Sequence, residues 1–253
     1  MPEVPPPGGE VDWPVDEGTL GVVGVAPWAT LEFCRVFYKR VGATKDWHYP
    51  RVLLDINTKI PSRGRHLQLG ETDPSEVIAA TIAELAAMGA TLAVVVCNTA
   101  HILYDRWAHE TPIPILHIIE ETVRAAAVSG AARIAPFVSA SLAERDLYGR
   151  HAGSLGLECE RLDSAAQRVI NNTIDEVKMS GRLGEAQSTA VDGLLRALKE
   201  SGVDSVIAGC TELSLLESHC RDYGLRFVDS NVALAEAALR RLALPGRLLD
   251  LVG

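Results

Sequence analysis

Short apolar runs alternate with longer amphipathic stretches along the chain from Gly18 onward. Runs rich in Val, Ile and Leu are typical of buried strands, whereas apolar residues at helical spacing are typical of amphipathic helices. We predict strands at Thr19–Val25, Arg51–Ile56, Leu92–Val96, Ile115–His117, Arg133–Phe137, Glu158–Arg161, Ser205–Ala208 and Arg226–Val228. We predict helices at Trp28–Val41, Pro74–Met88, Asn98–His109, Ile119–Ser129, Leu142–Leu155, Ala165–Lys178, Leu183–Ser201 and Val232–Leu242. This alternation is typical of α/β proteins built on parallel sheets.

One sequence pattern occurs twice in the chain. An amphipathic helix ends at Gly89, an apolar strand follows, and Cys97 stands just after that strand. The same succession of helix, glycine, strand and cysteine passes through Gly202 and ends at Cys210. The duplication predicts two similar α/β lobes whose parallel sheets face a shared interlobe cleft. Because ligands in open α/β sheets bind beyond the carboxyl ends of the strands, both cysteines are expected to face that cleft.

The predicted domain boundaries follow from this duplication. Residues 18–117 and 214–253 are expected to form the first lobe, which carries Cys97, with a C-terminal strand and helix returning to complete it. Residues 118–213 are expected to form the second lobe, which carries Cys210. Residues 1–17 are acidic and rich in Pro and Gly, which is typical of a flexible tail and unlike a secretory signal.

Composition and charge favour a soluble cytoplasmic enzyme. The 253 residues are 47% hydrophobic and 23% charged, as is typical of globular proteins. The formal net charge of −9 argues against a nucleic-acid partner, which requires clustered Lys and Arg. Membrane partners are not expected either, because no apolar run approaches the ~20 residues that span a bilayer. The odd number of cysteines, without a secretory signal, indicates reduced thiols in the cytoplasm.

The two cysteines of the repeated pattern suggest an acid–base pair. Each precedes a predicted helix start, where free N–H groups and the helix dipole favour an anion and lower a thiol pKa from about 8.5 towards neutrality. One thiolate could remove a proton from a carbon while a thiol on the opposite side delivers another. This chemistry inverts the carbon and needs no metal, pyridoxal phosphate or nucleotide. Zinc is disfavoured by the ligand spacing around Cys97 and Cys210, and Cys34, Cys159 and Cys220 are interpreted as packing residues.

The segments Cys97–Asn98–Thr99–Ala100–His101 and Gly209–Cys210–Thr211–Glu212–Leu213 resemble the two signatures of the aspartate/glutamate racemase family, in particular its aspartate racemase branch. The similarity extends from Gly21 to about Leu239. This resemblance implies two Rossmann-like lobes, a cofactor-independent two-base mechanism, an acidic amino acid or derivative as substrate and commonly a homodimer. It also implies that Cys210 serves the L-enantiomer and Cys97 the D-enantiomer.

The same resemblance implies binding roles for residues outside the two motifs. Ile60–Pro61–Ser62–Arg63 is similar to an Ile-Pro-Asp-Arg segment whose Arg binds a substrate carboxylate, so Arg63 is the main candidate and nearby Arg65 is a competitor. Asn57 matches an Asn that lines the site. Lys178 matches a lysine that holds the acidic side chain, although a Lys near a helix end also stabilises the helix dipole. The other residues expected to bind substrate are Asn98, Thr99, Ser139 and Thr211, and those expected to support the thiols are His101 and Glu212.

Two loops depart from the family's pattern. The family's Gly-Gly-Met-Gly-Pro turn before Ala-Thr is altered in Gly24–Thr30, where glycines are lost and Trp28 is expected to add an aromatic wall to the cleft. The family's Leu-Ala-Thr-Thr-Gly-Thr loop is replaced by Ala135–Ser141, where Pro136 lacks an N–H and Phe137 adds volume. We therefore expect an intact thiol pair in an altered pocket that favours a larger or less polar acidic substrate.

Three functions stay open on the sequence alone. A racemase acting on aspartate, glutamate or a derivative is favoured by the two cysteine motifs. A related carbon-acid isomerase, decarboxylase or lyase acting on a modified acidic substrate is suggested by the altered loops. A non-catalytic binding protein on the same scaffold is disfavoured, because binding alone requires neither thiol.

Overall fold

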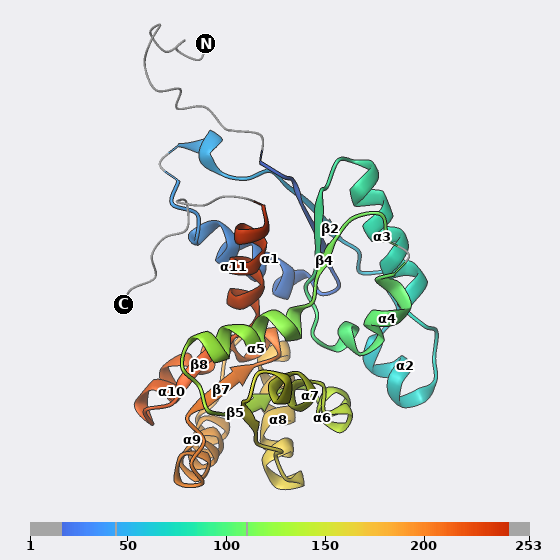
Figure 1. The fold of residues 1–253 in the computed structure, drawn as a ribbon. Coiled ribbons are helices and arrows are strands. Elements are labelled where there is room, and N and C mark those ends of the chain that lie inside the picture. The colour runs from blue at the N-terminus through green and yellow to red at the C-terminus, as the bar shows by residue number, and fades with distance from the viewer. Residues whose placement is uncertain (1–16, 44, 110, 243–253) are drawn as a thin grey trace, which may run out of the picture.

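The described residues of the computed structural model, 17–43, 45–109 and 111–242, form two four-stranded parallel sheets (Figure 1). The first sheet contains β1 (Leu20–Gly24), β2 (Val52–Ile56), β3 (Leu92–Val95) and β4 (Ile115–Leu116), in the order β2-β1-β3-β4. The second contains β5 (Arg133–Phe137), β6 (Glu158–Cys159), β7 (Ser205–Ala208) and β8 (Arg226–Asp229), in the order β6-β5-β7-β8. The two sheets therefore share one strand order, and the predicted α/β class with two similar lobes is confirmed.

The helices cover both faces of each sheet. The long helices are α1 (Pro27–Lys39), α3 (Ser75–Ala87), α5 (Ile118–Val128), α8 (Ser164–Ser180), α9 (Glu185–Glu200) and α11 (Ser230–Arg241). The shorter ones are α2 (Arg63–Leu69), α4 (Tyr104–Trp107), α6 (Ala140–Arg145), α7 (Leu147–Ser154) and α10 (Glu217–Asp222). Three 3-10 helices complete the described elements, namely η1 (Asp46–His48), η2 (Thr99–Leu103) and η3 (Thr211–Leu216).

Two predicted helices have a different form in the structure. The helix predicted at Asn98–His109 begins as the 3-10 helix η2 and continues as the short helix α4. The helix predicted at Leu142–Leu155 is divided into α6 and α7 by Asp146, whose φ of 49° is left-handed. The helices α2 and α10 were not predicted, since both are short and largely polar.

The strands are buried because helices pack on both of their faces. In the first sheet, Val22 and Val94 face α1 and α11, whereas Val23 and Val95 face α3 and α4. Apolar side chains therefore occur at consecutive positions along each central strand, as is typical of parallel sheets. In the second sheet, α8 and α9 cover the face to which Phe137 contributes. One core cluster extends from α1 through α5 into the second sheet, so the two lobes share apolar packing.

The polypeptide passes between the lobes twice, once from β4 into α5 and once from β8 into α11. Strand β8 pairs in parallel with β7, so the prediction that this C-terminal strand completes the first lobe is wrong. Helix α11 does pack against α1, and it also packs against α5 (Figure 1). The pairing partner of β8 is set by long-range contacts, which explains the error. The tail predicted at 1–17 lies almost wholly outside the described residues, as does the segment 243–253.

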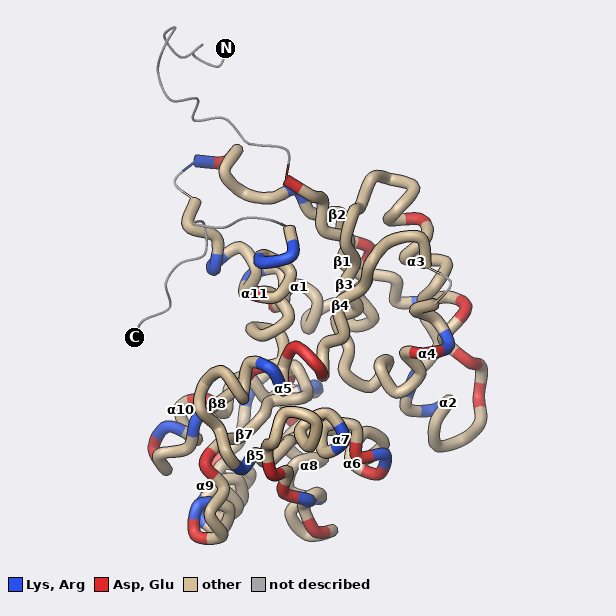
Figure 2. Tube along the Cα trace, viewed as in Figure 1, with Lys and Arg blue, Asp and Glu red and all other residues tan. Residues whose placement is uncertain are grey.

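Acidic and basic residues alternate along the outer helices α9 and α10 and around α6 (Figure 2). Mixed charge of this kind is typical of solvated surface. Within the described ranges, no helix combines the length and apolar character needed to cross a membrane.

Candidate active site

The two cysteines of the repeated motif occupy equivalent positions in the two lobes. Strand β3 ends at Val95 and β7 ends at Ala208, so Cys97 and Cys210 are each the second residue beyond the third strand of their sheet. Both thiols are half-buried. They lie at the carboxyl edges of the sheets, where ligands bind in open α/β folds.

Both cysteines line one cavity of about 540 Å³ between the lobes. The first lobe contributes the ends of β1 and β3 together with α2, and the second contributes the ends of β5 and β7 together with α8. The polar and charged residues of its lining are Ser62, Arg63, Gln68, Asn98, Thr99, Ser139, Ser141, Asn171, Asp175, Lys178, Thr211 and Glu212. This volume suits a small molecule, and the lining agrees with the shared cleft expected from the sequence.

Burial and the neighbouring Glu212 hold Cys210 in its thiol form. Its Sγ donates a hydrogen bond to Oε2 of Glu212 at 2.9 Å, and the Thr211 hydroxyl donates to the same oxygen at 3.1 Å. Burial, followed by the Glu212 carboxylate, raises the pKa of the Cys210 thiol well above its usual range, while Lys178 acts in the opposite direction. The predicted lowering of this pKa by a helix N-terminus is therefore wrong. The element that follows Cys210 is the short 3-10 helix η3, and burial and the carboxylate outweigh it.

His101 supports Cys97 through the main chain. The ring is 2% exposed, and burial lowers its pKa to about 4, so it is neutral at pH 7. Its Nδ1 donates to the carbonyl oxygen of Cys97 at 2.9 Å, and its Nε2 accepts the Ile118 N–H at 3.4 Å. His101 therefore ties the chain segment that carries the thiol to the start of α5, and its hydrogen bond is to the backbone of Cys97.

Polar side chains beside Cys97 connect the two lobes. Asn98 is 5% exposed, its Nδ2 donates to Oγ of Ser230 at 3.0 Å, and its Oδ1 accepts the Tyr148 hydroxyl at 2.7 Å. The hydroxyls of Thr99 and Ser139 lie 3.2 Å apart and come from different lobes. Asn98 is thus fixed as part of the cavity wall, whereas Thr99 and Ser139 present hydroxyls to the cavity.

Two cationic side chains line the cavity from opposite lobes, Arg63 at the start of α2 and Lys178 on α8. Nη1 of Arg63 donates to two backbone carbonyls at 3.1 and 3.3 Å, whereas its buried Nε has no hydrogen-bond partner among the described residues. A guanidinium anchored in this way keeps donors for a carboxylate. Its competitor Arg65 instead forms an exposed ion pair with Glu71 and does not line the cavity.

Three residues expected at the cleft lie elsewhere. The Asn57 amide donates to a hydroxyl on α3 at 2.9 Å and does not line the cavity. Phe137 is fully buried in the core of the second lobe. Trp28 is 83% exposed and lines an adjoining groove of about 980 Å³, which shares Lys178 and Glu212 with the thiol cavity. The expected aromatic wall therefore belongs to the groove.

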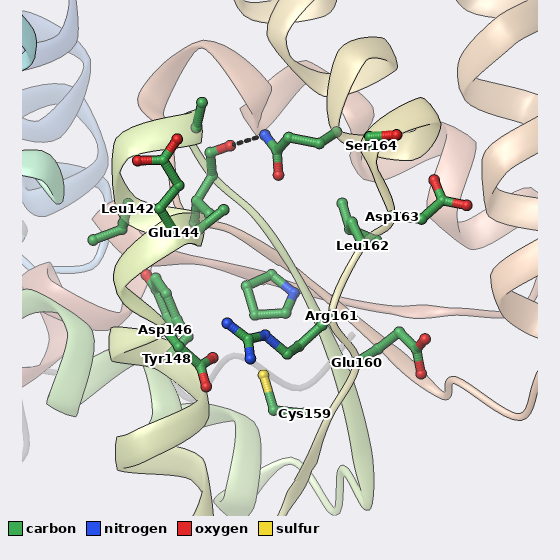
Figure 3. Close-up of a pocket in the computed structure, with 15 residues that line it drawn as sticks. Leu142, Glu144, Asp146, Tyr148, Cys159, Glu160, Arg161, Leu162, Asp163 and Ser164 are labelled. Atoms are coloured by element: carbon green, nitrogen blue, oxygen red, sulfur yellow. Dashed lines mark hydrogen bonds between the residues drawn. The ribbon is translucent and has the colours of Figure 1, made fainter. Parts of the chain in front are cut away.

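A second, smaller cavity of about 290 Å³ lies in the second lobe (Figure 3). Helices α6 and α7 border it on one side, and β6 with the segment leading into α8 borders it on the other. Cys159 lies beside Arg161 in this cavity, and burial raises the pKa of its thiol to about 12. The acidic residues of the lining are Glu144, Asp146, Glu160 and Asp163. This cavity holds a single thiol, whereas the interlobe cavity brings together two thiols from equivalent positions, so the interlobe cavity is the stronger candidate.

Three residues of the cavity lining were missed by the sequence analysis: Gln68, Asn171 and Asp175. The Gln68 amide donates to the Ser141 hydroxyl at 3.1 Å across the cleft. Gln68 lies on α2, whose serine N-cap and left-handed glycine C-cap are sequence signals from which this helix could have been predicted. Asn171, Asp175 and Lys178 lie three and four residues apart and therefore share one face of α8. Of these three residues, the sequence analysis had identified only Lys178.

Comparisons with known proteins agree with this geometry. The family model described as Asp/Glu/Hydantoin racemase matches residues 21–238. A glutamate racemase of Shewanella woodyi is 28% identical over 194 residues, which cover 73% of this chain and 71% of that protein. A broad specificity amino-acid racemase, RacX, of Bacillus subtilis is 24% identical over 219 residues, which cover 83% and 88% of the two chains.

Solved structures share the fold. The Picrophilus torridus aspartate racemase superposes with a TM-score of 0.78 at 21% identity, covering 89% of this chain and 94% of that one. An aspartate racemase homologue from Pyrococcus horikoshii gives a TM-score of 0.74 at 19% identity, covering 89% and 99%. The family model spans most of the described residues, including both cysteine motifs. The chain therefore belongs to the Asp/Glu/Hydantoin racemase family, as its two cysteine motifs predicted.

Proposed function

We propose that this protein is an amino-acid racemase that inverts the Cα of an acidic amino acid or a derivative by two-thiol acid–base catalysis. The observation that carries the proposal is the equivalence of Cys97 and Cys210, which follow corresponding strands and line one cavity from opposite lobes. A carbon held between them is accessible to a base on one side and an acid on the other. Membership of the racemase family supports the same reaction.

The proposed reaction transfers two protons and leaves both thiols ready for the reverse turnover. The thiolate of one cysteine takes the Cα proton and becomes a thiol, while the bond electrons stay on carbon and spread into the carboxylate. The thiol of the other cysteine then protonates the opposite face and becomes a thiolate. The product has inverted configuration, and the sum of charge on the two sulfurs is unchanged. No redox step or external acid is needed in this scheme.

The cavity lining supplies the charges that such a carbanion requires. Arg63 lines the cavity from the first lobe and Lys178 lines it from the second, so each could bind one carboxylate of an acidic substrate. Hydroxyls of Thr99, Ser139 and Thr211 add hydrogen-bond donors. Cations that contact the α-carboxylate stabilise the negative charge that grows there during proton removal.

Glu212 gives Cys210 a route for proton exchange. Its carboxylate accepts the thiol hydrogen bond in the resting state, which suits Cys210 to act as an acid. For the reverse direction Cys210 must become a thiolate, and Glu212 is positioned to take up that proton. General acid–base assistance of this type contributes about 10²–10⁴-fold to rates.

A homodimer in the cytoplasm is part of the proposal. The five cysteines are free, which fits a reducing compartment, and the family resemblance implies two subunits. Light scattering on purified protein across a range of concentrations measures the subunit number. A monomer at all concentrations would contradict the dimer and would leave the catalytic proposal intact.

A related carbon-acid reaction on a larger acidic substrate is the second candidate. It is supported by the groove of about 980 Å³ that adjoins the thiol cavity and shares Lys178 and Glu212 with it. Isomerisation, decarboxylation or elimination would start from the same proton removal or carbanion. The two candidates differ in what happens to the carbanion.

Incubation in D2O with each enantiomer of aspartate and glutamate separates the candidates. NMR follows deuterium at Cα, and chiral chromatography follows the configuration of the product. Deuterium incorporation with inversion supports racemisation. Exchange without inversion, or a new product, supports the second candidate. An absence of exchange with these and other acidic amino acids would overturn both candidates and favour a binding protein.

A further inference from the structure

Three side chains of types that can ligate a metal lie close together near the start of α5, outside the thiol cavity. His117 is the N-cap of α5, Glu120 lies in the first turn of that helix, and His151 comes from α7. One potential ligand atom from each residue lies within 4.8 Å of the other two. His117 is 9% exposed, whereas the Glu120 and His151 side chains are 47% and 29% exposed. The cluster thus combines a buried anchor with two ligands that solvent can reach.

We propose that His117, Glu120 and His151 bind one divalent transition-metal ion of the zinc type. Two imidazoles and a carboxylate are a donor set that such ions prefer, and water would occupy a fourth position. Ligand atoms in a tetrahedral zinc site lie about 3.4 Å apart, given metal–ligand bonds of about 2.1 Å. Nδ1 of His151 and Oε1 of Glu120 are already 3.9 Å apart. Small rotations of these two half-exposed side chains would therefore close the site.

The environment of His117 suits coordination. The His117 ring packs against the rings of His101 and His151, with centroid distances of 4.8 and 5.1 Å. Its Nδ1 accepts the Glu120 N–H at a long 3.3 Å, which leaves Nε2 as the ligand. Coordination through Nε2 would place the ring proton on Nδ1, so the long contact with the Glu120 N–H would be lost when the ion binds.

The proposed metal would stabilise the junction between the lobes. His117 stands where the chain passes from β4 into α5, and its ring is 4.8 Å from the His101 ring. His101 in turn contacts the Cys97 carbonyl and the Ile118 N–H. An ion that binds only the folded state raises stability as its concentration rises. We expect thermal stability to increase with added zinc, independently of whether the protein racemises any substrate.

Titration of tag-free, EDTA-treated and dialysed protein with Co²⁺ and Zn²⁺ tests the proposal. Visible absorption of Co²⁺ reports coordination by nitrogen and oxygen, and equilibrium dialysis with elemental analysis gives the Zn²⁺ stoichiometry. We expect one equivalent in the wild type and an upward shift of the melting temperature. His151→Ala and Glu120→Gln should each weaken this binding by more than about 100-fold, beyond the loss typical of a merely supporting residue.

His219→Ala is the matched control, because this histidine pairs with Asp192 away from the cluster. It should retain wild-type stoichiometry, and circular dichroism without metal should show that all variants fold. Three results would overturn the proposal: no bound metal, full binding by both His151→Ala and Glu120→Gln, or a sulfur-to-cobalt charge-transfer band showing that the thiols hold the ion. The D2O exchange assay is separate, so failure of the metal site leaves the racemase proposal untouched.

Discussion

The thiol of Cys210 and the carboxylate of Glu212 form a hydrogen bond of 2.9 Å. Among the described residues, the thiol of Cys97 has no corresponding carboxylate hydrogen bond. Two positions that correspond in topology therefore differ in electrostatics. On the proposed mechanism, we expect the half-reaction at Cys210 to depend on the Glu212 carboxylate, which can be tested at that cysteine.

Glu212→Gln should lower the pKa of Cys210 by removing a negative charge and an ionic acceptor. Alkylation of the Cys210 peptide, followed by mass spectrometry across a pH series, should accelerate at lower pH than in the wild type. Racemisation should nevertheless fall by about 10²-fold, because the proton acceptor is lost. Glu200→Gln at the exposed end of α9 serves as the control. An unchanged alkylation profile for Glu212→Gln would show that this contact does not set the pKa.

Cys97→Ala and Cys210→Ala should each abolish inversion and leave the fold intact. One base survives in each variant, so exchange of the Cα proton should persist for a single enantiomer. By family resemblance, Cys97→Ala keeps exchange with the L-enantiomer and Cys210→Ala with the D-enantiomer. Cys159→Ala, in the smaller cavity, should racemise at the wild-type rate. Full racemisation by either alanine variant would refute the two-base mechanism.

Arg63→Ala should reduce kcat/KM for acidic substrates. A charge-assisted hydrogen bond contributes about 1.5–3 kcal/mol, which corresponds to one to two decades in kcat/KM. Arg63→Lys should restore only part of the loss, because an ammonium cannot form the paired contacts of a guanidinium. Arg65→Ala is a closely matched control, since that side chain pairs with Glu71 on the surface. Equal kinetics for Arg63→Ala and Arg65→Ala would remove Arg63 from the site.

Trp28→Ala tests whether the groove beside the cavity selects larger substrates. We expect kcat/KM for aspartate to be unchanged and kcat/KM for aromatic-bearing acidic analogues to fall, because Trp28 lines the groove but not the thiol cavity. Competition between aspartate and the analogues gives the preference directly. A clear preference of the wild type for plain aspartate would show that the groove does not determine specificity.

Acid should destabilise the protein through His101. Its pKa is about 4 in the folded protein, below the ordinary 6.5. Between these two pH values the unfolded chain is protonated at His101, whereas the folded protein is not. Stability is therefore lost as pH falls below 6.5, and the loss is complete near pH 4. Between pH 7 and pH 5 this amounts to about 2 kcal/mol. Urea unfolding of the wild type and His101→Asn at both pH values measures it. The variant should show a smaller pH effect than the wild type or a His219→Asn control.

Local sequence patterns predicted the fold well where strands are continuous apolar runs. Leu92–Val96 and Ser205–Ala208 lie at the centres of the two sheets, so their burial on both faces appears directly in their composition. Local patterns could not predict which sheet contains β8, because its sequence fits either sheet and its pairing with β7 is a long-range contact.

The candidate site could be predicted only in part for a similar reason. The motifs located Cys97, Cys210 and the residues adjoining them, since these follow strand ends. They gave the wrong direction for the pKa of Cys210, which depends on burial and on the Glu212 rotamer. The altered loop that contains Trp28 was expected to line the cavity, whereas the Trp28 side chain lies in the adjoining groove.

The two passages of the chain between the lobes restrict how the cleft can open. One leads from β4 into α5 and the other from β8 into α11, and α5 packs against α11. A single linker would permit twisting in any direction, whereas two adjacent linkers define an axis about which the lobes can rotate. Gln68 contacts Ser141 and Thr99 contacts Ser139 across the cleft, so these hydrogen bonds must break for the lobes to separate. Under the proposed mechanism, rotation about this axis would admit substrate and release product, and the closed arrangement is the one in which Cys97 and Cys210 line the same cavity.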